Sequence, residues 1–360
     1  MKVRLYSHIG AGTGYARMGE MLARALITAG CELEVRPLLP WNHVRLHPDD
    51  ILIRHLRRDN ELTPPDATVV HTLPVDVRTV LKALSGTPHA IPVLNSKLVA
   101  YTTWEFQNDI PASIAADMTG DYDDFWWPCA QNRRAAEIHL GGHVVPIAYD
   151  PKEWMPERER YDDRFTFYYV GAWTDRKNPI GIVKAYAKAF GHADKVRLRL
   201  QVAGADLDRV KAEIDQAIGP DTADRPMISV HAGRVSEREL WYMHRSSDCF
   251  VSATRGEAWN LPAFEALCAG RAIIHTAGTG ADDFLADTTA LMVPAAPAKV
   301  TPGSDATWLE IDHDALVLAM LACVRLRVDQ TLVHYNLADR YSYAAVGAQA
   351  RNLLENIKQP

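Results

Sequence analysis

Short apolar runs alternate with amphipathic stretches along most of the chain. Runs at 2–7, 32–38 and 165–170 have the apolar and β-branched character of buried strands, and sequence with helical spacing separates such runs. Further strands are expected to end near His71, Leu94, Thr103 and Pro128, and others to cover 197–203, 227–231, 249–251 and 272–275. Strands that alternate with helices predict parallel sheets, so the predicted fold class is α/β.

The organising stretch is RGEAWNLPAFEALCAGRAIIHTAGTG, from Arg255 to Gly280. It follows the apolar run 249–251, so its first loop is expected at the carboxyl end of a parallel strand, where open α/β sheets bind ligands. Asn260 can cap the following helix and Pro262 suits its first turn. Glu257 precedes this helix and Glu265 lies inside it, so the two carboxylates are expected to reach different parts of one ligand.

A similar arrangement follows the strand at 165–170. After Gly171 come Arg176 and Lys177, with Asn178 as a cap and Pro179 at the first helical position. Two cations before a helix N-terminus suit a diphosphate, because the helix dipole and the side chains attract the same anion. A basic pair on a surface turn is the alternative interpretation.

The first strand is followed by glycines at alternate positions, Gly10, Gly12 and Gly14, and then by a helix expected over 15–29. Neither frame gives the G-x-G-x-x-G pattern of dinucleotide enzymes, because Tyr15 and Arg17 stand where the third glycine belongs. The loop can still let a substrate approach the backbone closely.

Length and charge limit the function classes. A chain of 360 residues favours two domains, and the charged stretch 157–164 is the best linker, which predicts domains at 1–158 and 159–340. A formal net charge of -6 gives no general attraction to nucleic acid or anionic membranes. The five scattered cysteines form no CxxC pair, and no apolar run has spanning length, so a cytoplasmic protein is expected.

The basic stretch 41–58 allows two interpretations. A solvated charged face is favoured, but Trp41 and Ile53 beside Arg54, Arg57 and Arg58 would also suit an acceptor or a membrane surface. A peripheral membrane association therefore stays open.

Several rival motifs are absent from the sequence. There is no P-loop, no G-x-S-x-G elbow and no zinc-ligand spacing. D-x-D spacings begin at Asp121, Asp206 and Asp312, but the second begins a helix and the others fall in loops, so no metal site is predicted.

The chain resembles the retaining nucleotide-sugar glycosyltransferases of family 4, which have the GT-B architecture of two Rossmann-like parallel-sheet domains facing a central cleft. The resemblance is carried by Glu257 to Glu265 (E-x7-E), Gly171 to Asn178, the stretch 233–248, the segment 144–150 and Thr103-Trp104-Glu105. Many relatives have histidine where Trp104 stands, and Ala258 and Asn260 replace glycines common in the family. The sugar preference is therefore open.

The resemblance implies roles for the matching positions. The N-terminal domain would bind the acceptor and the C-terminal domain the donor, and the helix within 341–360 would return to the first domain. Glu265 would hold the ribose, Glu257 the transferred sugar, and Arg176 with Lys177 the diphosphate. Glu105 would orient donor or acceptor, unless it forms a structural ion pair. The remaining donor contacts implied are Gly12, Gly14, Gly171, Arg234, Val235, Trp259, Asn260, Leu261 and Gly280.

The predicted function is that of a metal-independent, retaining hexosyltransferase that moves sugar from a nucleoside diphosphate, most simply UDP or GDP, to an acceptor hydroxyl. No further cofactor is expected. A non-catalytic sugar-nucleotide-binding protein and a dinucleotide-dependent oxidoreductase are the alternatives. A glycan, a lipid-linked intermediate, a small molecule and, less readily, a modified nucleic-acid base all stay open as acceptors, as do the linkage and the oligomeric state.

Overall fold

The computed structural model describes residues 1–38, 40, 43–57, 64–85, 96–118, 122–150, 159, 162–326 and 334–357. Several sequence predictions lie outside these residues: the strand ending near Leu94, the roles of Trp41 and Arg58, the D-x-D at Asp121, and half of the expected linker 157–164. The chain forms two compact units. The first contains residues 1–104, 109–150 and 338–360, and the second contains 105–108 and 151–337.

The first unit is built on a parallel sheet with the strand order β2-β1-β3-β4-β5-β6. Its strands are β1 (Lys2–Ser7), β2 (Glu32–Pro37), β3 (Ala67–His71), β4 (Lys97–Tyr101), β5 (Asp124–Trp127) and β6 (His143–Val144). Its helices are α1 (Gly14–Thr28), the 3-10 turns η2 (Ile51–His55) and η3 (Pro74–Asp76), α2 (Val77–Ser85), α4 (Ala112–Met118), α5 (Ala130–Ala135) and α13 (Tyr343–Asn356), with α12 (His334–Tyr341) leading in from the second unit. β3 is buried along its whole length, as expected for a strand with both faces covered.

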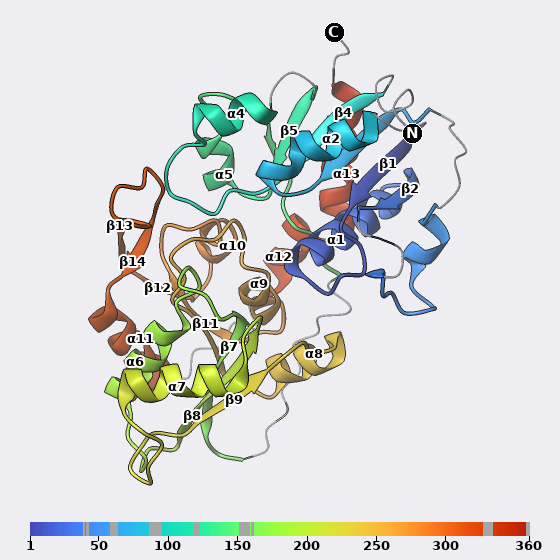
Figure 1. Ribbon diagram of the computed structural model, residues 1–360. Helices are drawn as coiled ribbons and strands as arrows, with labels where there is room; N and C mark the ends of the chain where they lie inside the picture. Colours follow the sequence, from blue (N-terminus) through green and yellow to red (C-terminus); the bar gives the residue numbers. More distant parts are fainter. Residues whose placement is uncertain are drawn as a thin grey trace. The chain divides into compact units, whose positions relative to one another are not determined.

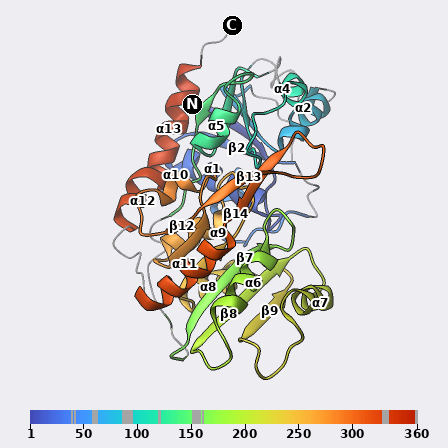
Figure 2. The same cartoon turned by 90° about the vertical axis from the view of Figure 1, so that its left-hand side faces the viewer.

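The C-terminal helix α13 packs on α1 within the first unit (Figures 1 and 2). A Cβ atom at Gly347 would lie 2.0 Å from the backbone oxygen of Ala25, so glycine permits the two helices to approach closely. Arg351 also donates a hydrogen bond from Nη1 to the oxygen of Ala29, at 2.8 Å. The last helix of the chain is therefore part of the first unit.

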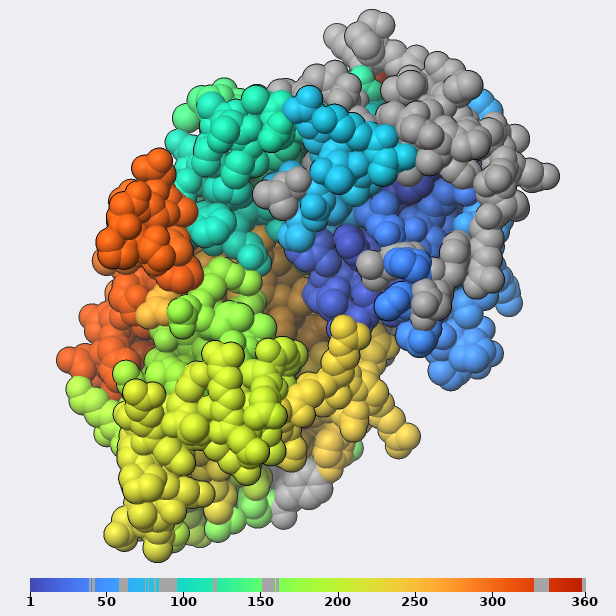
Figure 3. Space-filling view, viewed as in Figure 1, coloured from blue at the N-terminus to red at the C-terminus, as the bar shows by residue number. Residues whose placement is uncertain are grey.

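The second unit contains a parallel sheet in the order β12-β11-β10-β7-β8-β9 and a separate antiparallel hairpin, β13-β14. The strands are β7 (Phe165–Ala172), β8 (Val196–Ala203), β9 (Ile228–Ala232), β10 (Cys249–Ser252), β11 (Ala272–Thr276), β12 (Leu291–Val293), β13 (Ala295–Lys299) and β14 (Thr307–Ile311). The helices are α6 (Pro179–Ala189), α7 (Leu207–Ile218), α8 (Glu237–Arg245), α9 (Leu261–Cys268), α10 (Asp282–Leu285) and α11 (His313–Leu326). In Figure 3 the hairpin, coloured orange, stands at the surface of this unit.

Side chains of β7 alternate between two faces of this sheet. Phe167 and Tyr169 belong to a large apolar cluster with buried residues of α6, α7 and α11. Tyr168 points the other way, where its hydroxyl meets His244 of α8. The sheet is thus covered on both faces, and ligand-accessible groups are left at the ends of its strands.

Three details differ from the sequence predictions. The helix expected over 130–140 ends at Ala135, because the chain turns from Ala136 onward and Gly141 and Gly142 take positive φ. The strand expected from Val144 is short, with only His143–Val144 paired to β5. The hairpin β13-β14 was not predicted, because AAPAK contains a proline and has little β propensity.

Candidate functional site

The loop after β7 carries the two predicted cations. It spans residues 173–178, and α6 begins at Pro179, where the missing N–H of proline costs nothing. Asn178 takes a left-handed conformation (φ 51°), and its Oδ1 accepts a hydrogen bond from the N–H of Gly181 at 3.1 Å. The cap fixes where the helix starts and so where Arg176 and Lys177 leave the backbone.

The loop after β10 ends in the same way. Asn260 also has a positive φ (70°) and caps α9, and its Nδ2 donates to Oγ of Ser252 at 3.0 Å. The left-handed conformation is unusual for a residue with a side chain, so these hydrogen bonds are what hold it. Both predicted caps are therefore present, each after a strand of one sheet.

His275 of β11 completes the support of Asn260. Its Nδ1 lies 2.8 Å from the carbonyl oxygen of Thr276, which can only accept, so Nδ1 carries the proton. Nε2 is then an acceptor, and Nδ2 of Asn260 donates to it at 2.9 Å. Burial lowers the pKa of His275, which favours the neutral ring that this arrangement requires.

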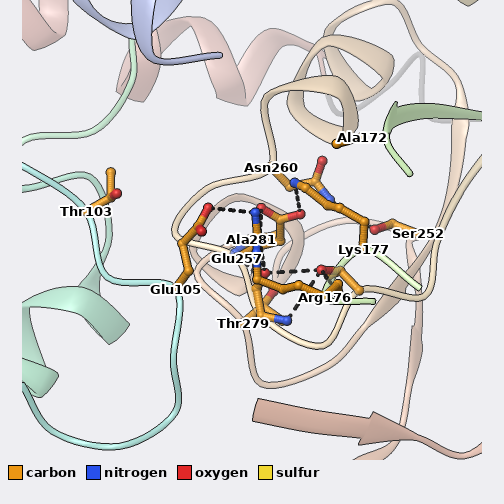
Figure 4. A network of polar contacts seen from close by, with 12 residues as sticks. Thr103, Glu105, Ala172, Arg176, Lys177, Ser252, Glu257, Asn260, Thr279 and Ala281 are labelled. Atoms are coloured by element: carbon orange, nitrogen blue, oxygen red, sulfur yellow. Dashed lines mark hydrogen bonds and ion pairs between the residues drawn. The ribbon is translucent and has the colours of Figure 1, made fainter. Parts of the chain in front are cut away.

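Four charged side chains converge at these loops (Figure 4). The ammonium of Lys177 forms an ion pair with Oε1 of Glu257. Nη1 of Arg176 lies 3.5 Å from Oε2 of Glu257, and Nη2 lies 3.0 Å from Oε1 of Glu105. The structure thus brings together all four residues predicted to be catalytic, within the second unit.

Backbone contacts bind the two loops to each other. The N–H of Arg255 donates to the oxygen of Arg176 at 2.7 Å, and the N–H of Gly280 donates to the oxygen of Glu257 at 3.0 Å. Gly256 is needed for the approach of Glu105, because a Cβ atom there would lie 2.1 Å from the Glu105 oxygen. The charged groups are therefore held by a rigid frame.

The two carboxylates of the cluster differ in environment. The side chain of Glu257 is 4% exposed, whereas that of Glu105 is 37% exposed. Burial raises the pKa of Glu257, but Lys177 and Arg176 more than offset this and hold it below its usual value. Burial raises the pKa of Glu105 above its usual value, and Arg176 offsets this only in part.

Glu265 lies apart from this cluster. It is 2% exposed, and its Oε2 is 3.6 Å from Nε2 of His244, whose Nδ1 lies 2.7 Å from the hydroxyl of Tyr168. Burial raises the pKa of Tyr168, which therefore stays a neutral hydroxyl. The second glutamate of the E-x7-E spacing thus has its own buried surroundings.

The other predicted donor contacts are spread over the same unit. Trp259 packs with Phe264 and Phe284. The remaining ones are Gly171 inside β7, exposed Arg234 and half-buried Val235 after β9, Leu261 at the start of α9, and Gly280 beside Glu257. Gly12 (φ 62°) and Gly14, the first residue of α1, belong to the first unit.

The sequence reasoning did not find His244, His275 or Ser252. A histidine inside the otherwise apolar strand AIIHT is the one local signal, because a fully buried imidazole requires a hydrogen-bond partner. The sequence does not indicate which residue this partner is, because Asn260 lies fifteen residues before His275.

A cavity of about 680 Å³ opens behind the Arg176 loop. Its walls include Trp173, Thr174 and Asp175 of the loop, Lys184 of α6 and Glu310 of the hairpin. Arg176, Lys177 and Glu257 do not line it. The charged cluster and this cavity are therefore separate features of the second unit.

The architecture defines the class of the protein. HepE of Anabaena in complex with UDP and glucose matches with a TM-score of 0.66 at 12% identity, over 99% of each chain. The sucrose-phosphate synthase of Thermosynechococcus elongatus (TM-score 0.68, 15% identity) and a glycosyltransferase of Rickettsia africae (0.68, 12%) match over 99% of this chain and 98% of theirs. The chain has the GT-B fold, with two parallel six-stranded sheets, which confirms the predicted fold class.

Within that class, residues 150–299 match the family model described as glycosyl transferases group 1. This range contains the Arg176 loop, Glu257 and Glu265. No curated protein sequence matches the chain. In the described part of the chain, no helix is long and apolar enough to cross a membrane.

Proposed function

We propose that the protein is a glycosyltransferase that moves a sugar from a nucleoside diphosphate to an acceptor hydroxyl. The observation that carries the proposal is the convergence of Arg176, Lys177 and Glu257 at the carboxyl ends of β7 and β10. The family match over 150–299 and the UDP-bound state of HepE support a nucleotide-sugar donor. Sugar nucleotides of UDP and GDP are the first donors to test.

The proposed chemistry follows from charge. When the bond between sugar and phosphate breaks, negative charge grows on the departing diphosphate, and fixed cations stabilise that state more than the ground state. Arg176 and Lys177 would supply this charge, together with the N-terminus of α6. Without a donor these cations contact carboxylates, and the donor diphosphate would take over part of those contacts.

We place the enzyme in family 4 and expect it to be a metal-independent, retaining hexosyltransferase. Retention would proceed by attack from the face that the diphosphate leaves, with the acceptor hydroxyl passing its proton to the departing phosphate. A double displacement would need a carboxylate free to act as nucleophile. Glu257 is buried and paired with Lys177, which does not suit that role.

The remaining assignments are part of the same proposal. Glu257 would contact the transferred sugar together with the amides near Trp259 to Leu261, and Glu265 would hold the ribose. The backbone at Arg234 and Val235 would lie along the base. Gly12 and Gly14 of the first unit would let the donor approach its backbone, and that unit would bind the acceptor.

Donor turnover tests the proposal. Purified protein is incubated with UDP-glucose or GDP-mannose, and release of UDP or GDP is followed without an acceptor and with simple sugars. Lys177→Ala should abolish release, whereas Lys211→Ala, an exposed lysine on α7, should leave it unchanged. Circular dichroism shows whether both variants are folded.

The alternatives give different results. Tight nucleotide binding that depends on Lys177, with no release under any condition, would indicate a sugar-nucleotide-binding protein. A fluorescence change on addition of NADH would favour an oxidoreductase. Equal turnover in Lys177→Ala and the parent protein would contradict the role assigned to Lys177.

A further inference from the structure

Arg176 lies between two carboxylates. Its Nη2 is 3.0 Å from Glu105 and its Nη1 is 3.5 Å from Glu257, while Lys177 pairs with Glu257. Two cations thus balance two anions in this cluster. The whole cluster belongs to the second unit, because the segment 105–108 is part of it.

A diphosphate would disturb this balance. It adds negative charge beside the carboxylates and draws Arg176 and Lys177 toward its own oxygens. An added anion and a weakened cation contact both favour the protonated form of a neighbouring carboxylate. One of the two carboxylates must then take up a proton or remain as an additional negative charge near the ligand.

The structure indicates which carboxylate it is. Glu257 keeps a direct contact to Lys177, receives Arg176 as well, and has a pKa below its usual value. Among the residues that the structure describes, Arg176 is the cation in direct contact with Glu105, and the pKa of Glu105 is already raised. The other ionised groups that act on Glu105 are Glu257 and the more distant Lys177, and the first of these also opposes its ionisation.

Hydrogen bonds and close packing hold the backbone of the segment that carries Glu105. The N–H of Gln107 donates to the oxygen of Thr307 at 2.8 Å, and the N–H of Thr307 donates to Oδ1 of Asn108 at 3.0 Å. The oxygen of Glu105 lies against Gly256. The backbone at Glu105 is therefore held beside the loop that carries Glu257.

We propose that binding of the donor diphosphate is coupled to the uptake of a proton by Glu105. The proton comes from solvent and returns to it when the nucleoside diphosphate leaves, so the reaction has no net proton change at this residue. The protonated carboxyl can donate a hydrogen bond to the donor, which an ionised one cannot. The inference rests on the proposed function, since it requires a diphosphate at Arg176.

Calorimetry in buffers with different heats of ionisation measures the proton count directly. The probes are UDP-glucose and GDP-mannose, whose diphosphates are esterified at both ends and do not titrate near neutral pH. At a pH between the free-state and bound-state pKa values of Glu105, the parent protein should take up a fraction of a proton, at most one, per donor bound, and Glu105→Gln about none. Asp314→Asn, which removes an exposed carboxylate paired with Lys188, serves as the matched control and should behave as the parent.

The pH dependence of donor affinity gives a second readout that needs no variant. The pKa of Glu105 is higher in the complex than in the free protein under this proposal, so affinity is greatest below the free-state value. As the pH rises from the free-state to the bound-state pKa of Glu105, the donor affinity falls by up to tenfold per pH unit. Glu105→Gln should remove this slope.

Each outcome decides a separate question. Donor binding without proton uptake, or uptake that persists in Glu105→Gln, overturns the coupling and leaves the proposed function intact. If neither sugar nucleotide nor UDP, GDP or ADP binds, the proposed function fails and the coupling fails with it.

Discussion

The carboxylate of Glu257 is almost fully buried and contacts two cations, so its charge is tolerated only because of them. The backbone oxygen of Glu257 accepts a hydrogen bond from the N–H of Gly280, and the oxygen of the preceding Gly256 accepts one from the hydroxyl of Thr254. At the scale of single residues, the loss of one charge should therefore destabilise the protein more than the loss of the whole pair.

Lys177→Met should destabilise the protein by about 2–4 kcal/mol, because it leaves Glu257 buried with a weaker partner. The double variant Lys177→Met with Glu257→Gln should recover at least about half of that loss. Urea denaturation of the parent, both single variants and the double variant measures the coupling. Additive effects of the two substitutions would contradict this account of the ion pair.

The lowered pKa of Glu257 predicts a loss of stability in acid. A carboxyl with a lower pKa in the folded than in the unfolded state stabilises the fold above the unfolded-state pKa. That contribution disappears as the pH falls from about 4.5 through the folded-state value. Urea midpoints measured at several pH values should fall less steeply for Glu257→Gln than for the parent, whereas equal slopes would contradict the assignment.

At the scale of elements, each of the two loops ends in an asparagine with positive φ, followed closely by a proline. The sequence predicted the helix starts, because Asn-Pro and Asn-x-Pro are strong N-terminal signals. It did not predict that Asn260 would be held from the side by Ser252 and His275, because such contacts join residues that only the folded sheet brings together.

Asn260→Ala should cost about 2–3 kcal/mol, because it removes a cap, strains a left-handed backbone and leaves Nε2 of His275 without its donor. Asn260→Gly should cost less, because glycine adopts this conformation freely. Thermal unfolding of both variants, with Asn178→Ala and Asn178→Gly as the matched pair, gives the comparison. If Asn260→Gly is less stable than Asn260→Ala, the side chain of Asn260 does not act by stabilising the left-handed backbone conformation.

The same reasoning explains which elements the sequence predicted well. Strands β3, β7 and β11 are mainly apolar runs, whereas β1 and β8 alternate apolar with polar residues, and the structure has all five within a residue or two. The hairpin β13-β14 has neither a uniform apolar run nor alternation strong enough to detect, and part of its stability comes from Arg255, whose oxygen accepts from the N–H of Leu309 at 2.7 Å. Tertiary contacts of that kind leave no local pattern.

At the scale of the whole molecule, each of the two units contains segments that lie far apart in the sequence. The second unit takes Glu105–Asn108 from within the first half of the chain, and the first unit takes back α13 from its end. The sequence predicted the return of the last helix to the first unit only through the family resemblance, because a short amphipathic helix does not show which surface it packs against. It gave no sign that Glu105 would pack with Gly256.

Gly347→Val should destabilise the first unit by about 2–4 kcal/mol, because the added side chain meets the backbone of α1 at Ala25. Hydrogen exchange resolved by peptide should show faster exchange in α1 and α13 and little change in β7 and β10. Asn352→Val, at an exposed position of the same helix, is the control. Equal protection in both variants would mean that α13 does not depend on this close approach.

The central claim is that Arg176 and Lys177 bind the diphosphate of a sugar nucleotide. The most direct measurement is the ratio of dissociation constants, by calorimetry, between a nucleoside and its diphosphate, using whichever of UDP, GDP and ADP binds best. The account predicts that the diphosphate binds at least about a hundredfold more tightly than the nucleoside, and that Lys177→Ala reduces this ratio to about tenfold or less while the nucleoside alone binds as before. A ratio that is the same in the parent and in Lys177→Ala would contradict the claim.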